Sequence, residues 1–274
     1  MLKERFHIAV PTAFSQDESL NIQGTIEHIR YLFNQGIKSV LVCGSTGEQH
    51  SLNLKEKLTL LNAVSKEEDL ITNMEILFGV SSIRQVEAVE LAQAVRETKI
   101  AGILLGYSPY LLPSQEDALR YSEMIIEASS KPTIIYNNPK RTGFDLSVEN
   151  VIRLSKTKKV IGIKEAGDKA RVKQLKEYVK DDFHYYAGGE IDLEEKVKLG
   201  FNRLSSITGN LYPTEIKNWF FDLLEGHQSL KYEREEINVL IDKVFIGSPL
   251  VNLKNGINEK GIEMGICRSP LGNT

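Results

Sequence analysis

Short, mostly apolar runs rich in β-branched residues recur through the chain, separated by polar stretches. Runs of this kind are typical of strands that are buried on both faces of a parallel sheet. We therefore predict eight strands, at Phe6–Val10, Ser39–Cys43, Ile76–Val80, Gly102–Leu105, Thr133–Tyr136, Val160–Lys164, His184–Ala187 and Leu204–Ile207.

Segments of helical period lie between these runs, with apolar residues near three- and four-residue spacing. They predict helices at Ile22–Gln35, Leu54–Glu68, Arg84–Glu97, Gln115–Ser129, Leu146–Ser155, Arg171–Val179 and Leu193–Leu199. Strand and helix alternate, which indicates an α/β protein. This many units match a closed (β/α)8 barrel, the TIM barrel, better than an open doubly wound sheet, which usually has fewer units and a Gly-rich phosphate turn.

After Gly209 the pattern changes to helices without strands. These helices are predicted at Pro213–Leu224, Tyr232–Val244 and Pro249–Met264. We therefore predict a barrel domain over residues 1–209 and an all-helical C-terminal extension over residues 210–274 that packs on the barrel.

The charge pattern favours small-molecule partners. The 274 residues carry a net charge of −3 and no long block of like charge, so we expect neither nucleic acid nor an anionic membrane as a partner. No apolar run reaches the ~18 residues of a membrane span, and the two cysteines and the amino terminus fit a reduced, cytoplasmic protein. The histidines lack ligand spacing, and no metal or nucleotide motif is present, so we expect no metal.

Lys164 ends the sixth predicted strand. An ammonium in this position loses hydration, which lowers its pKa and frees the amine as a nucleophile that can form a Schiff base. The plainer interpretation is a strand-end lysine that pairs with Glu165 or reaches water. For a lysine taken alone the plainer interpretation is the more common one, because most lysines are solvated.

Other polar residues follow the strands at the same end of the predicted barrel, where the sites of such barrels lie. Ser45 and Thr46 stand in a glycine-flanked turn after the second strand, Tyr110 follows the fourth, and Tyr136 and Arg141 follow the fifth. Each alone has an ordinary explanation: a helix cap for the hydroxyls, packing for the tyrosines and a surface charge for the arginine. Their joint position favours a site.

Three motifs in this order and spacing resemble one known family. They are Gly44-Ser45-Thr46-Gly47-Glu48, then Tyr136-Asn137-Asn138-Pro139 followed by Arg141-Thr142-Gly143, and Gly162-Ile163-Lys164-Glu165-Ala166. The chain resembles, over nearly its whole length, the pyruvate-dependent Schiff-base lyases and synthases of the dihydrodipicolinate synthase and N-acetylneuraminate lyase family.

The resemblance implies a role for each matching residue. Lys164 forms the Schiff base with pyruvate, Tyr136 relays protons to and from it, and Ser45 links the two tyrosines of the relay. Thr46 binds the pyruvate carboxylate. No organic cofactor is implied, because the imine itself is the electron sink.

The resemblance also implies an assembly and a pocket wall. Tyr110 matches the tyrosine that the family inserts into a neighbouring subunit's site, which implies a homodimer, commonly doubled to a homotetramer. Gly188 and Ser205, after the seventh and eighth strands, match positions that line the pocket with backbone carbonyls. Relatives usually continue past the position of Thr274 into one more helix, which bears on the assembly rather than on the chemistry.

Arg141 distinguishes between members of the family. The synthases use an arginine there to hold the carboxylate of L-aspartate 4-semialdehyde, which a guanidinium suits, and this second substrate is our prediction. The residues that depart from the synthase pattern are Ser45, Pro109, Leu111, Leu112 and Gly189. The alternatives are a 2-keto-3-deoxy sugar acid aldolase or N-acetylneuraminate lyase, and, in another class, a pyruvate-binding regulatory protein without turnover.

Many synthases of this family are inhibited by free lysine in a cleft between paired subunits. The corresponding positions here include Lys57, Ile83 and Pro109, with Glu87 as the remaining partner for an ammonium group. A like charge and two lost polar or aromatic contacts disfavour the ligand. We therefore expect weak regulation by lysine.

Overall fold

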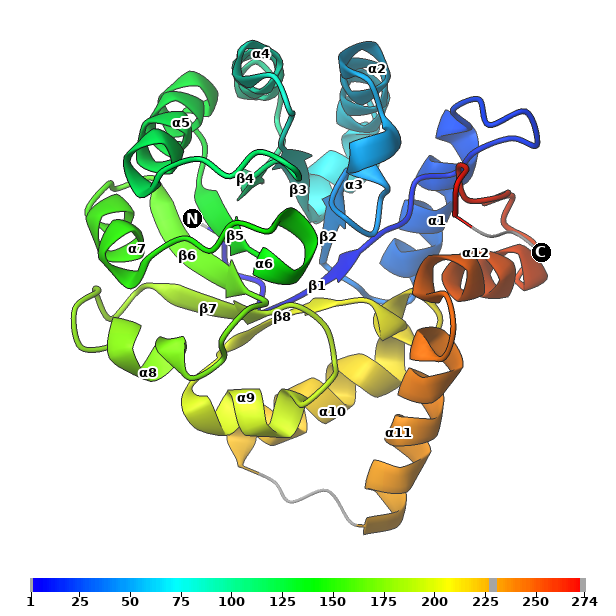
Figure 1. Cartoon of the computed structure of the whole chain (residues 1–274). Coiled ribbons are helices and arrows are strands. Elements are labelled where there is room, and N and C mark those ends of the chain that lie inside the picture. The colour runs from blue at the N-terminus through cyan, green and yellow to red at the C-terminus, as the bar shows by residue number, and fades with distance from the viewer. Residues whose placement is uncertain (1, 227–230, 272–274) are drawn as a thin grey trace.

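The computed structural model describes residues 2–226 and 231–271. Eight parallel strands form a closed barrel in which each strand pairs with its neighbours in sequence and β8 pairs with β1 (Figure 1). All eight predicted strands are confirmed, within a residue or two at each end. Their bounds are β1 Phe6–Ala9, β2 Ser39–Val42, β3 Glu75–Val80, β4 Gly102–Gly106, β5 Thr133–Asn137, β6 Val160–Glu165, β7 His184–Ala187 and β8 Arg203–Ser206.

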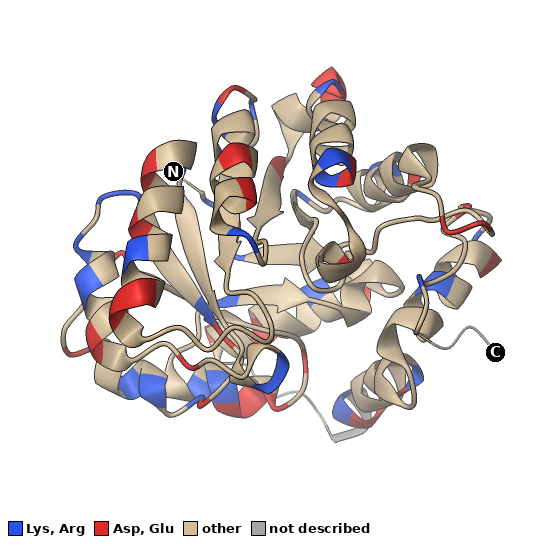
Figure 2. Ribbon diagram, turned by 45° about the horizontal axis from the view of Figure 1, so that its top comes forward, with Lys and Arg blue, Asp and Glu red and all other residues tan. Residues whose placement is uncertain are grey.

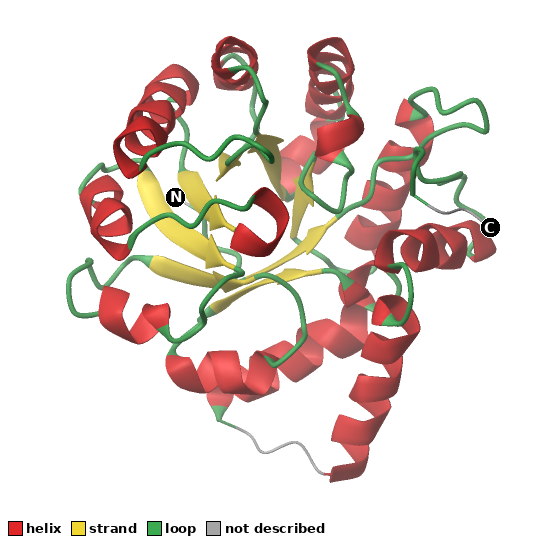
Figure 3. Ribbon diagram, viewed as in Figure 1, coloured by secondary structure: helices red, strands yellow, loops and turns green. Residues whose placement is uncertain are grey.

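The helices form a ring outside the strands (Figure 3). Lys, Arg, Asp and Glu are interspersed over this outer ring, with both signs on most helices (Figure 2). The described helices are α1 Ile22–Asn34, η1 Gln49–Ser51, α2 Leu54–Ser65, α3 Glu68–Asn73, α4 Gln85–Arg96, α5 Gln115–Ser129, α6 Pro139–Thr142, α7 Val148–Ser155, α8 Arg171–Leu175, α9 Leu193–Leu199, η2 Thr208–Asn210, α10 Pro213–Glu225, α11 Lys231–Phe245 and α12 Pro249–Glu259.

Several helix boundaries differ from the prediction for local reasons. The helix predicted over Leu54–Glu68 ends at Ser65, because Glu67 leaves the helical conformation, and a further helix that was not predicted, α3, begins at Glu68. Helix α7, which was predicted to start at Leu146, begins at Val148, because the Ser147 side chain accepts a hydrogen bond from the backbone N–H of Asn150 and caps the first turn. The helices predicted over Arg171–Val179 and Pro249–Met264 end early, at Leu175 and Glu259.

Residues that alternate along each strand point to different cores. Ala9, Leu41, Leu77, Ile134 and Tyr186 belong to a small cluster inside the barrel, whereas a larger cluster fills the layer between strands and helices. The strand register sets Tyr136 of β5 beside Lys164 of β6. Both side chains therefore stand at the carboxyl ends of neighbouring strands.

The first C-terminal helix covers the barrel. Ile216, Trp219 and Phe220 of α10 join the core between strands and helices, and the Phe220 ring lies 6.3 Å from that of Phe6. The boundary predicted after Gly209 runs through the short helix η2. Beyond α10, helices α11 and α12 pack together and share a third apolar cluster. No helix in the described part of the chain is both long and apolar enough to cross a membrane.

Candidate active site

Lys164 is the fifth residue of the six-residue strand β6, and Glu165 is its last. The alternation of the strand sends the two side chains in opposite directions. Glu165 accepts hydrogen bonds from Asn137, the Gly167 backbone and Arg171, and is completely buried. The plainer interpretation, in which Lys164 pairs with Glu165, is therefore contradicted.

The Lys164 side chain is enclosed, with 6% of the residue exposed. Its Nζ donates to the Ser205 hydroxyl at 2.8 Å and lies 4.8 Å from the centre of the Tyr136 ring. No carboxylate of the described residues forms an ion pair with it at 4.0 Å or less. Burial is the main cause that lowers the pKa of Lys164. Among the described residues, the amine thus has no carboxylate close enough to form an ion pair with it.

Tyr136 stands between Lys164 and the open space above the barrel. Its hydroxyl accepts a hydrogen bond from Asn138 Nδ2 at 2.7 Å, and Ser45 is a second hydrogen-bond partner. Burial alone would raise the pKa of Tyr136, but the Lys164 charge and these hydrogen bonds lower it below the ordinary value. A phenol whose pKa is lowered next to an amine is suited to move a proton.

Asn138 was not singled out from the sequence. It lies just before α6 and is 9% exposed, and its amide fixes the orientation of the phenol that Lys164 faces. Its signal was its place in the Tyr136-Asn137-Asn138-Pro139 motif, but the sequence could not show where the side chain points.

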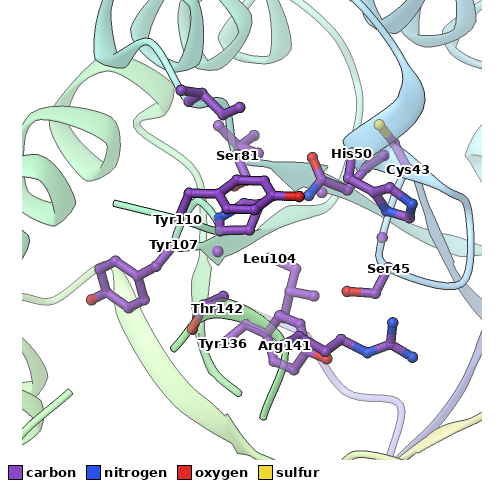
Figure 4. A pocket seen from close by; sticks show the side chains of 17 residues that line it. Cys43, Ser45, His50, Ser81, Leu104, Tyr107, Tyr110, Tyr136, Arg141 and Thr142 are labelled. Atoms are coloured by element: carbon purple, nitrogen blue, oxygen red, sulfur yellow. The ribbon is translucent and has the colours of Figure 1, made fainter. Parts of the chain in front are cut away.

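A cavity of about 420 Å³ opens beside Tyr136. Ser45, Tyr136 and Arg141 lie at one end of it, and Ser81, Tyr107 and Tyr110 lie toward the other (Figure 4). Lys164 is not part of the wall, but its Nζ lies 4.8 Å from the centre of the Tyr136 ring, which is part of it. The full wall consists of Cys43, Gly44, Ser45, Gln49, His50, Gly79, Val80, Ser81, Ile83, Leu104, Gly106, Tyr107, Pro109, Tyr110, Tyr136, Arg141 and Thr142.

Arg141 comes from α6, a four-residue helix that the sequence analysis missed. Pro139 starts this helix, and Gly143 ends it in the left-handed conformation, with φ of 74°. The guanidinium is exposed at the cavity. Its charge acts on both Lys164 and Tyr136. The structure thus places Arg141 at the cavity, and its predicted role in binding a substrate carboxylate stays a prediction.

Gly188 and Ser205 both contact the lysine. Gly188 follows β7, and a Cβ on it would lie 3.3 Å from Lys164 Cε, so a larger residue there would crowd the lysine side chain. Ser205 lies within β8 rather than after it, and it presents its hydroxyl to Lys164. Ser205 therefore contacts Lys164 through its side chain, and the predicted contribution of its backbone carbonyl stays a prediction.

Thr46 and Tyr110 have different surroundings. Thr46 is 8% exposed and lies in the turn that carries Ser45. Tyr110 lines the cavity, is 89% exposed and has a left-handed backbone with φ of 69°. Their predicted roles, in binding a carboxylate and in reaching a second subunit, stay predictions.

A closed barrel with a buried amine beside a phenol at the strand ends defines a lyase of the aldolase type, in which an amine attacks a carbonyl group. The model of the dihydrodipicolinate synthetase family matches residues 3–274. The chain therefore belongs to this family, and the resemblance of its three motifs is confirmed.

Curated relatives and solved structures agree with this family assignment. The 4-hydroxy-tetrahydrodipicolinate synthase of Methanococcoides burtonii is 29% identical over 269 residues, covering 96% of this chain and 90% of that protein. The enzyme of the same name from Escherichia coli O139:H28 is 31% identical over 236 residues, covering 85% of this chain and 80% of that protein. Dihydrodipicolinate synthase from Aquifex aeolicus has the same fold, with a TM-score of 0.92 at 22% identity over 99% of this chain and 93% of that one.

A further solved relative carries a ligand. The chloride-inhibited dihydrodipicolinate synthase from Acinetobacter baumannii, complexed with pyruvate, is 26% identical with a TM-score of 0.85, covering 97% of this chain and 91% of that one. The fold and the aldolase-type lyase class are thus supported by sequence and by structure.

Proposed function

We propose that this enzyme forms a Schiff base between Lys164 and pyruvate and condenses it with L-aspartate 4-semialdehyde, as a 4-hydroxy-tetrahydrodipicolinate synthase of the lysine and diaminopimelate branch. The observation that carries the proposal is the buried amine of Lys164, which contacts Ser205 and the Tyr136 ring and has no carboxylate partner among the described residues. The names of the curated relatives support the same reaction.

The first half of the reaction follows from these contacts. The neutral amine adds to the ketone carbon, and the carbinolamine loses water when Tyr136 supplies a proton to the leaving hydroxyl. Ser45 stabilises the resulting phenolate by a hydrogen bond, and the proton that the methyl group loses in the next step restores the phenol. The protonated imine acidifies the adjacent methyl group, and the resulting enamine adds to the aldehyde carbon of the second substrate. This route requires neither a metal nor an organic cofactor.

Arg141 carries the choice of the second substrate. It stands at the cavity that Tyr136 closes, and its guanidinium has no ion-pair partner within 4.0 Å in the described part of the chain. A carboxylate on the aldehyde would pair with it in a two-hydrogen-bond geometry. A polyol aldehyde would leave that charge uncompensated, which favours aspartate semialdehyde over a sugar aldehyde.

We also propose a homodimer, doubled to a homotetramer, in the cytoplasm, where substrates of this kind are metabolised. Tyr110, Leu111 and Leu112 are 89%, 49% and 70% exposed beside the cavity, and Ile83 is 57% exposed near them. Apolar side chains gathered in this way favour burial against another protein surface. A second copy of the chain would cover them and complete the cavity wall.

The test is a coupled assay with pyruvate and aspartate semialdehyde, in which dihydrodipicolinate reductase consumes the product. We expect turnover in this assay and none with polyhydroxylated aldehydes. Turnover with the sugar aldehydes alone would establish the aldolase alternative. Imine formation without turnover on any aldehyde would establish the regulatory alternative.

A further inference from the structure

Glu48 closes the turn that carries Ser45 and Thr46, and it has no role in the chemistry proposed above. Its side chain is completely buried, and its backbone is left-handed, with φ of 51°. This conformation is uncommon for a residue other than glycine, because it costs free energy that the surroundings must offset. The surroundings of Glu48 are therefore informative.

The carboxylate of Glu48 is bound by residues from the other end of the chain. Lys254 Nζ on α12 lies 2.7 Å from Oε1, with both side chains at most 1% exposed. The Arg268 backbone N–H donates to Oε2 at 3.0 Å. Cys267 is also hydrogen-bonded to this carboxylate, and burial raises the pKa of its thiol to about 11, so it stays protonated. Three groups within residues 254–268 thus hold one side chain.

The backbone of Glu48 connects this carboxylate to Ser45 through the turn. The Glu48 backbone N–H donates to the Ser45 carbonyl at 3.1 Å, and the Thr12 hydroxyl donates to the Gly47 carbonyl at 2.7 Å. Ser45 in turn is a hydrogen-bond partner of the Tyr136 hydroxyl. A displacement of Glu48 would therefore move the group that serves the phenol.

Residues 254–268, called the C-terminal segment below, are themselves attached to the barrel by further contacts. Lys254 Nζ also donates to the Ile266 carbonyl at 2.6 Å and lies 4.3 Å from the centre of the Phe14 ring. The Arg268 side chain binds the Glu56 carboxylate at 2.5 and 3.0 Å and the Ser51 carbonyl at 2.8 Å. Residues 254–268 are thus held both by Phe14, before the turn that carries Glu48, and by Ser51 and Glu56, after it.

We propose that the buried Lys254–Glu48 pair is a positioning device for the reaction, through which α12 and the C-terminal segment hold Ser45 in place for Tyr136. This inference rests on the proposed function, since it assigns the pair an effect on imine formation. Lys254 and Glu48 are positioning residues and do not touch substrate. A buried pair of this kind is sensitive to the loss of one partner, because the other charge is left uncompensated.

The test measures borohydride trapping of pyruvate at several pyruvate concentrations, per folded enzyme, in the full chain. Lys254→Met should lower the maximal rate of imine formation by about 10- to 100-fold, because small displacements of positioned groups cost on this scale. The double variant Glu48→Gln and Lys254→Met removes both charges, should fold if the single variant does not, and should also be slowed at least tenfold. Lys260→Met is the matched control, because Lys260 is exposed on the same segment and lies by Tyr31, not Glu48.

The maximal rate of trapping and the pyruvate concentration at half of that rate are read separately, per folded enzyme. A positioning role changes the maximal rate, whereas a loss of folded enzyme does not change the rate per folded molecule. The inference is supported if the folded double variant has a lower maximal rate of imine formation and Lys260→Met keeps the parental rate. A folded double variant that traps pyruvate at the parental rate would overturn it, even if its thermal stability is lower. If the parent enzyme itself forms no imine, the proposed function fails instead, so the two failures are distinguishable.

Discussion

Removal of the Tyr136 hydroxyl is the sharpest change that the site offers. Tyr136→Phe keeps the ring that lies 4.8 Å from Lys164 Nζ and removes the oxygen that Asn138 and Ser45 hold. If this oxygen carries the protons of imine formation, turnover should fall by about 10²–10⁴. At ~1.36 kcal/mol per factor of ten, this corresponds to about 3–5 kcal/mol of transition-state stabilisation.

The loss of folding stability should be much smaller. Asn138 loses one acceptor, and a single hydrogen bond contributes about 1 kcal/mol net. Tyr107→Phe is a matched control, because Tyr107 is buried, lines the same cavity, and directs its hydroxyl to Ser122 at 2.8 Å rather than to Lys164. Both variants should therefore lose similar stability, and only one should lose activity.

The assay is the steady-state rate with pyruvate and aspartate semialdehyde, together with the rate of borohydride trapping, which isolates the first half of the reaction. Both rates should fall in Tyr136→Phe and stay near the parental value in Tyr107→Phe. Near-normal rates in folded Tyr136→Phe would refute the proton-relay role and leave Tyr136 as a packing residue.

Three further predictions concern other parts of the chain. Arg141→Ala should lower kcat/KM for the aldehyde by an amount that corresponds to about 1.5–3 kcal/mol of binding free energy, the contribution of a hydrogen bond to a charged group. Trapping with pyruvate should stay intact. Loss of both aldehyde use and pyruvate trapping would make Arg141 a structural residue. Free lysine should inhibit only above a millimolar, because the ammonium of Lys57 is buried in the cleft wall and Ile83 offers no hydrogen bond; half-inhibition below a millimolar in the steady-state assay would contradict this. Burial lowers the pKa of His28 from 6.5 to about 4, so between these pH values the unfolded chain binds a proton that the folded chain does not. Acidification from pH ~6.5 to ~4 should therefore lower the free energy of unfolding by roughly 3 kcal/mol. Urea unfolding of His28→Gln should show a flatter dependence of this free energy on pH, and an equal slope would exclude His28 as the cause.

The strands could be predicted because a parallel barrel buries both faces of every strand. Each strand then appears in the sequence as a compact, mostly apolar run, and Lys164 near the end of Val160–Glu165 interrupts such a run with a charge. The helix α6 could not be predicted in this way, because four residues are too few to show a helical period. Glu67 likewise breaks a helix at a position that composition does not mark.

The contacts that depend on distant parts of the chain were not predictable from local pattern. Glu48 and Lys254 meet only because the C-terminal segment returns to the first strands. Ser205 was expected to offer its backbone, but its hydroxyl accepts a hydrogen bond from Lys164, and it can do so because β6 and β8 lie on either side of β7 in the closed barrel. Residue types and spacing indicate which side chains share an end of the barrel, whereas the particular partner of each depends on closure and packing.

The central claim is that Lys164 is the amine that binds pyruvate, and covalent trapping tests it most directly. Lys57 and Lys254 are also buried, so the site of modification must be mapped as well as counted. Lys57 donates to the Ser81 carbonyl and Lys254 is paired with Glu48, which leaves Lys164 as the reactive one of the three. With pyruvate and borohydride, we predict one pyruvate-derived adduct per chain on the peptide that contains Lys164; an adduct on another lysine, or none, would contradict the account.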